Sequence, residues 1–180
     1  MKTSTMLPLL MLMVVFSPLA IDIFLPALPI MALDLAVDIT LMQWSISIFL
    51  LTMGLGQLFS GPLADKYGRK PVAIVGISLY MLSAFTLYFT ATIESHLLFR
   101  ALQGFGSCAI SVAAFSIVRD KYNATESGMM YSYLNGFICC IPALAPLLGG
   151  WLTNQFNWQS NFMFMALFAV IACVTVAIFL

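Results

Sequence analysis

The stretch that decides the fold is GPLADKYGRKP, residues Gly61–Pro71, which separates two long apolar runs. Gly61 and Gly68 permit a close approach and a tight reversal of the backbone. Asp65 and Arg69 place opposite charges beside the apolar runs, where they can pair with each other or with a helix end. The pattern is typical of a short charged turn that joins two membrane-spanning helices at the membrane surface.

Composition extends this interpretation to the whole chain. Of its 180 residues, 62% are hydrophobic and 8% are charged, and the mean hydropathy is +1.04. A water-soluble domain carries about a quarter charged residues because its surface must stay hydrated, so a soluble globular domain is excluded. Seven Lys and Arg residues balance seven Asp and Glu residues, which leaves no net positive charge for binding DNA or RNA. The expected partner is membrane lipid, not nucleic acid.

Charged and turn residues divide the chain into six apolar stretches, each long enough to cross a bilayer as a helix of about 20 residues. The expected helices span about 6–30, 41–63, 72–92, 97–118, 128–150 and 160–180. We therefore expect an all-α membrane protein in which residues 1–180 form one bundle of six transmembrane helices. The four cysteines and one histidine lack the spacing of a metal site, so neither a metal nor a cofactor is expected.

Basic residues set the expected orientation, because loops that stay in the cytoplasm collect Lys and Arg. Six basic residues fall on the side of the membrane where the chain begins, namely Lys2, Lys66, Arg69, Lys70, Arg119 and Lys121. The opposite connectors hold no Lys or Arg, but contain Asp34, Asp38, Glu94 and His96. With six crossings, both termini are expected in the cytoplasm.

Two charged residues lie within apolar stretches, Asp22 in the first helix and Arg100 near the outer end of the fourth. A charge at the centre of a membrane helix costs roughly 2.5–3.5 kcal/mol on insertion scales. Each charge therefore needs a cavity, a partner or a route to the outer interface, and the position of Arg100 suits the last of these. The fourth helix carries a polar stripe at helical spacing, made of Arg100, Gln103, Gly104, Ser107 and Ser111. Such a stripe lines a water-filled path or binds neighbouring helices, and the first alternative accounts better for an arginine.

One face of the fifth helix carries residues that bend helices or permit close packing, among them Asn135, Pro142, Pro146 and Gly150. Proline removes a backbone donor and kinks a helix. The pair Gly149–Gly150 lets a neighbouring helix approach closely. The pattern fits a structural kink at a packing seam and also a hinge that bends during function.

The charged turn resembles the G-x-L-A-D-R-x-G-R-K signature of the major facilitator superfamily of transporters, with Lys66 in place of the usual arginine. Residues 100–106, RALQGFG, and residues 136–150, which end in APLLGG, resemble two further motifs of that superfamily in the expected order. Residues 22–29, DIFLPALP, resemble the D-x-x-x-P-x-x-P element of Bcr/CflA-type drug:proton antiporters. The resemblance spans nearly the whole chain, but only the amino-terminal half of such a transporter, which has about twelve helices in two bundles.

The resemblance implies the amino-terminal bundle of a major facilitator fold and proton-coupled multidrug efflux by alternating access across a bacterial inner membrane. Coupling of protons and substrate is then expected at Asp22, Arg100 and Gln103. A conformational latch on the cytoplasmic side is expected from Gly61, Asp65, Gly68, Arg69 and Asp120. Bending of the fifth helix is expected at Asn135, Pro142, Pro146 and Gly150. The implied partners are small amphipathic drug-like substrates, protons and a carboxy-terminal half that lies outside this sequence.

Two other classes of function are open to a chain of this kind. An intramembrane enzyme would need a catalytic arrangement such as H-E-x-x-H or G-x-S-x-G, and the sequence contains neither. A non-transporting fragment, or a half-size transporter that works as a dimer, fits the length. We expect a truncated form of a longer transporter, because the sequence stops at Leu180 where the last helix ends.

Overall fold

The first membrane crossing consists of four short elements. A computed structural model describes the backbone of residues 3–180 and the side chains from Met6 onward, so Lys2, predicted on the cytoplasmic side, lies outside the described residues. The elements are α1 (Thr3–Val14), α2 (Phe16–Asp22), the 3-10 helix η1 (Leu25–Ala27) and α3 (Leu28–Asp34). The sequence predicts one continuous helix over 6–30, and the structure corrects this. Pro18 and Pro26 lack the N–H that would donate to the carbonyls of Val14 and Asp22, four residues earlier. Helices α1 and α2 end at these two residues.

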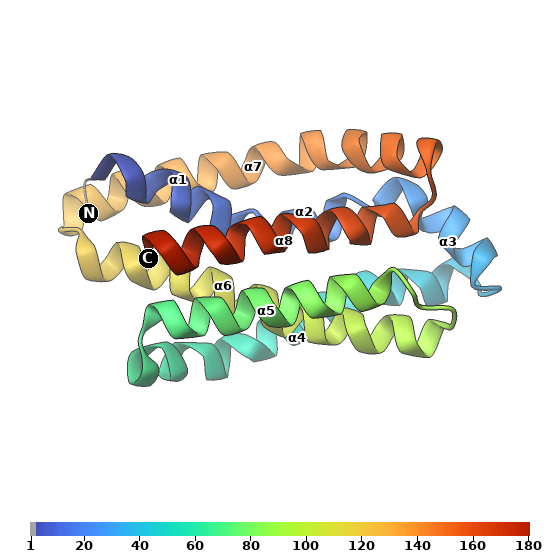
Figure 1. Cartoon of the computed structure of the whole chain (residues 1–180), viewed down its shortest axis with the longest axis horizontal. Helices are drawn as coiled ribbons and strands as arrows, with labels where there is room; N and C mark the ends of the chain where they lie inside the picture. The colour runs from blue at the N-terminus through green and yellow to red at the C-terminus, as the bar shows by residue number, and fades with distance from the viewer. Residues whose placement is uncertain (1–2) are drawn as a thin grey trace.

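Five long helices follow the first crossing. They are α4 (Ile39–Tyr67), α5 (Arg69–Leu87), α6 (Ile93–Lys121), α7 (Ala124–Gln155) and α8 (Gln159–Phe179). Together with residues 6–34 they give six segments long and apolar enough to cross a membrane, and residues 3–180 contain no strand. The predicted fold class, an all-α protein with six transmembrane segments, is confirmed. Both ends of the described chain lie at the same end of the bundle (Figure 1).

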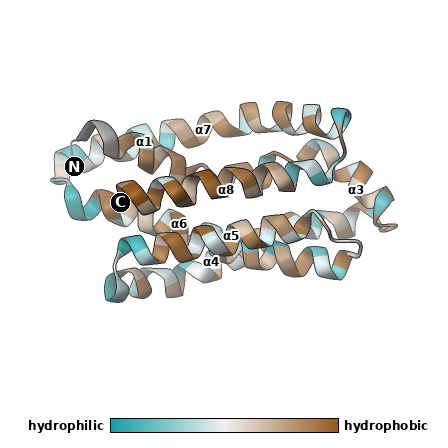
Figure 2. Ribbon diagram, in the orientation of Figure 1, coloured by the Kyte–Doolittle hydropathy of each residue, from teal (hydrophilic) through white to brown (hydrophobic). Residues whose placement is uncertain are grey.

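Polar residues gather at the two ends of the bundle, and apolar residues cover its middle (Figure 2). This distribution is what a bilayer requires, because the hydrocarbon region solvates apolar side chains while the ends meet water. We call the end that carries the turn between α4 and α5 the charged end.

Most connectors are shorter than predicted because the helices run further, but α5 ends at Leu87, five residues before the predicted end at 92. Only Gly68 separates α4 from α5, where a connector over residues 64–71 was predicted. Gly68 has a φ of 93°, in the region that glycine adopts without strain. At the start of α7, the Asn123 side chain accepts a hydrogen bond from the Glu126 N–H at 2.9 Å, and the Glu126 carboxylate accepts one from the Asn123 N–H at 3.3 Å. This capping box starts α7 within a predicted connector.

At the opposite end of the bundle, a connector predicted over residues 92–96 instead forms the first turn of α6. His96, predicted in a loop, is fully buried there, with its ring edge-on to the rings of Trp158 and Phe162. The Trp158 indole N–H donates a hydrogen bond to the Asp34 carboxylate at 2.7 Å. This contact joins the end of α3 to the start of α8.

Glycines let α6 pack closely against α4 on one side and α5 on the other. A Cβ added at Gly104 would lie 2.5 Å from the Phe49 carbonyl oxygen of α4. A Cβ added at Gly106 would lie 2.7 Å from the Tyr80 backbone nitrogen of α5. Small residues at helix crossings allow this approach, which membrane helices use to gain van der Waals contact.

Candidate functional site

A cavity of about 630 Å³ lies between the first crossing, α4, α6 and α7. Its polar lining residues come from three of these segments and are Ser17, Asp22, Gln57, Ser111 and Ser116. Among the described residues that line it, Asp22 is the only charged one. Most of the remaining lining is apolar, which is the usual composition of a small-molecule site with a few orienting polar groups. We call it the Asp22 cavity.

Asp22 is partly buried and is the last residue of α2. Pro26 cannot donate to the Asp22 carbonyl, which allows the helix to end at this residue. A charged carboxylate inside a membrane-spanning segment is costly unless a partner neutralises it. No Lys or Arg side chain described in the structure forms an ion pair with Asp22. A proton or a cationic ligand can serve as that partner.

Arg100 is fully buried in α6. Its guanidinium carbon lies 4.7 Å from the centre of the Phe24 ring and 4.6 Å from that of Phe49. Nη1 donates a hydrogen bond to the Gln103 side-chain oxygen at 2.6 Å, and Nε donates one to the Ser45 carbonyl at 3.2 Å. Two aromatic faces and two neutral acceptors therefore stabilise this buried cation.

The structure brings Arg100 and Gln103 together, but neither lines the Asp22 cavity. Arg100 and Asp22 form no ion pair in the described part of the chain. Their connection is indirect, since Phe24 contacts Arg100 and follows Asp22 by two residues. Further along the predicted stripe, Ser111 does line the cavity. The stripe thus binds neighbouring segments at one end and lines a cavity at the other, and its role in coupling stays a prediction.

The charged turn forms a network of ion pairs at the charged end. Arg69 pairs with Asp65 at 2.7 Å and with Asp120 at 2.8 Å, which joins the ends of α4, α5 and α6. Arg119 lies 3.7 Å from each of the same two carboxylates. Gly61 takes no part: within the described chain, nothing lies within 4 Å of a Cβ added there, so its predicted close approach is not seen. Exposed ion pairs contribute about 0–1 kcal/mol each, too little to hold the fold but enough to bias the arrangement of helix ends.

The four positions predicted to bend the fifth helix are Asn135, Pro142, Pro146 and Gly150, and α7 runs through all of them without a break. Pro142 lines the Asp22 cavity. The closest approach is made by the neighbouring residue Gly149, where an added Cβ would overlap the Ile23 carbonyl oxygen. The structure therefore shows a packing seam here, and bending of α7 stays a prediction.

Two lining residues of α4, Met53 and Gln57, were not predicted from the sequence. They lie four residues apart and so share one helix face, and the available signal was the polar Gln57 inside an apolar stretch. The Ser17 hydroxyl donates a hydrogen bond to the Met53 sulfur at 3.1 Å. This contact shows which face of α4 meets α2, and no local pattern in the sequence reveals it.

Six membrane-spanning segments, four of which enclose a cavity with one carboxylate among its described lining residues, are an arrangement suited to a membrane transport protein. Residues 10–180 match the family model described as Major Facilitator Superfamily, and the chain belongs to this superfamily. This confirms the family predicted from the charged turn and the two further motifs.

The chain is similar to two multidrug resistance proteins of Escherichia coli. Multidrug resistance protein D of Escherichia coli (strain K12) is 37% identical over 164 residues, which cover 91% of this chain and 42% of that protein. Multidrug resistance protein MdtL of Escherichia coli O139:H28 (strain E24377A / ETEC) is 37% identical over 158 residues, which cover 88% of this chain and 40% of that protein. The chain spans about two fifths of the length of these relatives.

Proposed function

We propose that the chain is the amino-terminal bundle of a proton-driven exporter of small amphipathic compounds, which works by alternating access in the inner membrane of a bacterium. One observation carries the proposal: Asp22 is the lone charged residue described on the wall of a largely apolar cavity of about 630 Å³. The names of the two relatives refer to multidrug resistance, which supports substrates of this class. The described chain ends lie at the charged end (Figure 1), which supports a cytoplasmic location for both.

Asp22 would couple the movement of protons to the movement of substrate by exchanging one positive charge for another. In an apolar surrounding a bare carboxylate is costly, so the side chain is stable when a proton or a cationic group neutralises it. A cationic substrate that reaches the cavity displaces the proton, and a proton that arrives later displaces the substrate. Apolar lining residues such as Met53 and Phe115 accommodate the body of the substrate, since thioethers and rings adapt to varied apolar shapes.

Arg100 and Gln103 would act on this exchange by positioning. Arg100 contacts Phe24 through its guanidinium, and Phe24 lies in the break between α2 and η1. The hydrogen bond to Gln103 fixes the guanidinium on α6. Together these contacts hold the break in place and so set the direction of the Asp22 side chain. We assign both residues a positioning role in coupling, without direct contact to the substrate.

The ion pairs of Arg69 would form the latch that favours one of two arrangements of the helix ends. Arg69→Ala removes both short ion pairs and should shift the conformational equilibrium by about threefold to tenfold. Substrate preference should stay the same, because Arg69 does not line the Asp22 cavity. Distances between spin labels across the charged end measure the equilibrium, and competition between substrates measures the preference.

Arg119→Ala is the matched control for the latch. Arg119 faces the same two carboxylates at the longer distance of 3.7 Å, and its side chain is 65% exposed where that of Arg69 is 19% exposed. A smaller shift is therefore expected. A changed substrate preference at an unchanged equilibrium in the Arg69→Ala protein would contradict the latch role.

Everted membrane vesicles from bacterial cells that produce the chain together with its carboxy-terminal half test the proposed export. Energised vesicles should accumulate a fluorescent amphipathic cation such as ethidium, and an uncoupler that collapses the proton gradient should stop the uptake. Uptake that persists after the collapse, or that is equal in vesicles without the protein, would contradict the proposal.

A further inference from the structure

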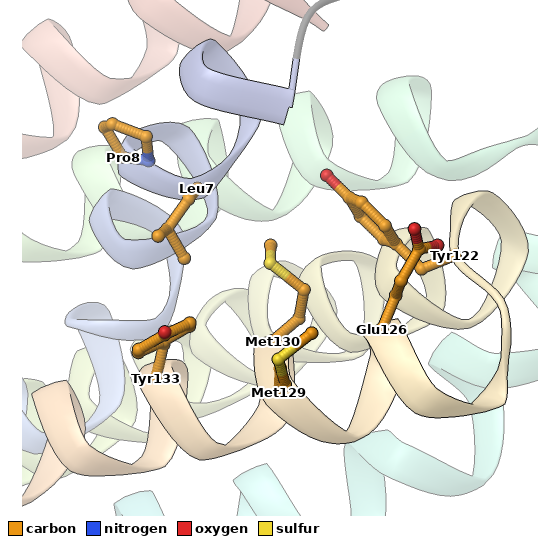
Figure 3. Close-up of a pocket in the computed structure, with 7 residues that line it drawn as sticks. All are labelled: Leu7, Pro8, Tyr122, Glu126, Met129, Met130 and Tyr133. Atoms are coloured by element: carbon orange, nitrogen blue, oxygen red, sulfur yellow. The ribbon is translucent and has the colours of Figure 1, made fainter.

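A second cavity, of about 460 Å³, lies at the charged end between α1 and the start of α7 (Figure 3). Its described lining residues do not overlap with those of the Asp22 cavity. They include one carboxylate, two phenol rings and two thioethers, which belong to Glu126, Tyr122, Tyr133, Met129 and Met130. We call it the Glu126 pocket, after the one charged side chain among its described lining residues.

The Glu126 pocket combines negative charge with aromatic and polarizable surface. In Figure 3 the Glu126 carboxylate lies beside the Tyr122 ring, and Leu7 and Pro8 of α1 stand across from them. Tyrosine rings attract cations through their faces, and thioethers adapt to irregular apolar shapes. The complementary occupant is therefore a cation that carries an apolar body.

Glu126 also belongs to the capping box that starts α7, where one of its oxygens accepts the Asn123 N–H at 3.3 Å. The ion pairs formed among the described side chains do not include Glu126. A capping box accepts glutamine as well as glutamate at this position. Capping alone thus does not require a charge, and the two roles can be separated by substitution.

The Glu126 pocket and the Asp22 cavity are neighbours along the seam between the first crossing and α7. Leu7 lines the first and Val14 the second, and seven residues of α1 separate them by roughly 10 Å along the helix axis. On α7, Tyr133 lines the first and Ile138 the second, and five residues separate them by roughly 8 Å. A ligand in the Glu126 pocket is therefore about one and a half to two helical turns from the Asp22 cavity.

We propose that the Glu126 pocket binds organic cations with an apolar body and holds them before they move along the seam to Asp22. The movement to Asp22 rests on the proposed function. Binding in the Glu126 pocket does not depend on Asp22, since the two sets of described lining residues are separate. The two claims can therefore fail independently.

Equilibrium binding of tetraphenylphosphonium tests the proposal, with the chain in phosphatidylcholine nanodiscs and with empty nanodiscs subtracted. In an Asp22→Asn background, binding should persist, and adding Glu126→Gln should weaken it by about fivefold without changing Tm, because glutamine keeps the capping box. Tyr133→Leu, which leaves the cap untouched, should weaken it by about threefold. Binding of tetraphenylborate, an anion of the same shape, should not weaken in the Glu126→Gln variant.

Glu94→Gln is the matched control, because it removes the same charge from the first turn of α6 at the opposite end of the bundle (Figure 1). It should leave tetraphenylphosphonium binding unchanged. Unchanged binding in both the Glu126→Gln and Tyr133→Leu variants would overturn the proposal, as would an equal loss of tetraphenylborate binding.

The binding measurements, together with a measurement of the protons released when tetraphenylphosphonium binds, separate the Glu126 pocket from the proposed function. Loss of all tetraphenylphosphonium binding through Asp22→Asn alone would overturn the Glu126 pocket and leave the proposed function standing. If Glu126→Gln weakens tetraphenylphosphonium binding while Asp22→Asn leaves the accompanying proton release unchanged, the result would support the Glu126 pocket and contradict the proposed function.

Discussion

Replacing Asp22 with Asn should abolish the release of protons that accompanies the binding of a cationic substrate. The parent protein is expected to release about one proton for each cation that reaches the Asp22 cavity, because proton and cation neutralise the same carboxylate. Asparagine has nearly the same size but carries no exchangeable acid proton, so proton and substrate no longer compete. Asp22→Glu keeps a carboxyl group displaced by one methylene and should retain part of the release. A pH indicator in weakly buffered solution measures the release when tetraphenylphosphonium is added to the protein in nanodiscs.

Asp38→Asn is the matched control for this prediction. Asp38 is exposed just before α4 and lines neither the Asp22 cavity nor the Glu126 pocket. Its substitution removes the same charge and should leave the release unchanged. Normal release by the Asp22→Asn variant would contradict the assignment of Asp22, and an equal loss in the Asp38→Asn variant would mean that total charge, not the cavity, controls the release.

The six crossings could be predicted because each follows from the local spacing of apolar and charged residues. The break in the first crossing could not, although Pro18, Pro26 and Pro29 were visible in the sequence. A membrane helix tolerates proline as a kink when neighbouring groups satisfy the freed carbonyls. Packing decides between a kink and a break, and here Gly149 brings the α7 backbone against Ile23, inside the break. This contact joins segments more than a hundred residues apart, so no local pattern could reveal it.

The candidate site could be predicted only in part, because some of its features follow from local spacing and others depend on contacts between distant segments. Asp22 was visible because a charge inside an apolar stretch demands a partner. The sequence also predicted that Arg100 and Gln103 share a helix face, but could not show that aromatic rings, and no carboxylate, receive the guanidinium. That outcome depends on which segments face α6. Glu126 was not predicted as a site residue because it lies in a predicted connector, where a charged side chain is common.

Gly149→Ala should lower Tm by roughly 2–12 °C and reduce the yield of folded protein. The added Cβ would overlap the Ile23 carbonyl oxygen, a backbone atom that cannot rotate away as a side chain does. Overpacking of this kind costs about 1–3 kcal/mol, and each kcal/mol lowers Tm by roughly 2–4 °C in a chain of this size. Since Ile23 adjoins Asp22, a shift of the backbone there should also reduce proton release. Thermal unfolding in detergent and the release assay measure the two effects.

Gly150→Ala is the matched control, because it changes the next residue of the same helix. Its added Cβ would lie 3.8 Å from the nearest atom, the Cβ of Pro26, which is ordinary van der Waals contact. Alanine also favours a helix over glycine by up to about 1 kcal/mol, so Gly150→Ala should hold or raise Tm. Two adjacent substitutions of the same kind should thus act in opposite directions. Equal stability of the two variants would show that α7 and the break do not touch at Gly149, and would remove the packing reason for the position of Asp22.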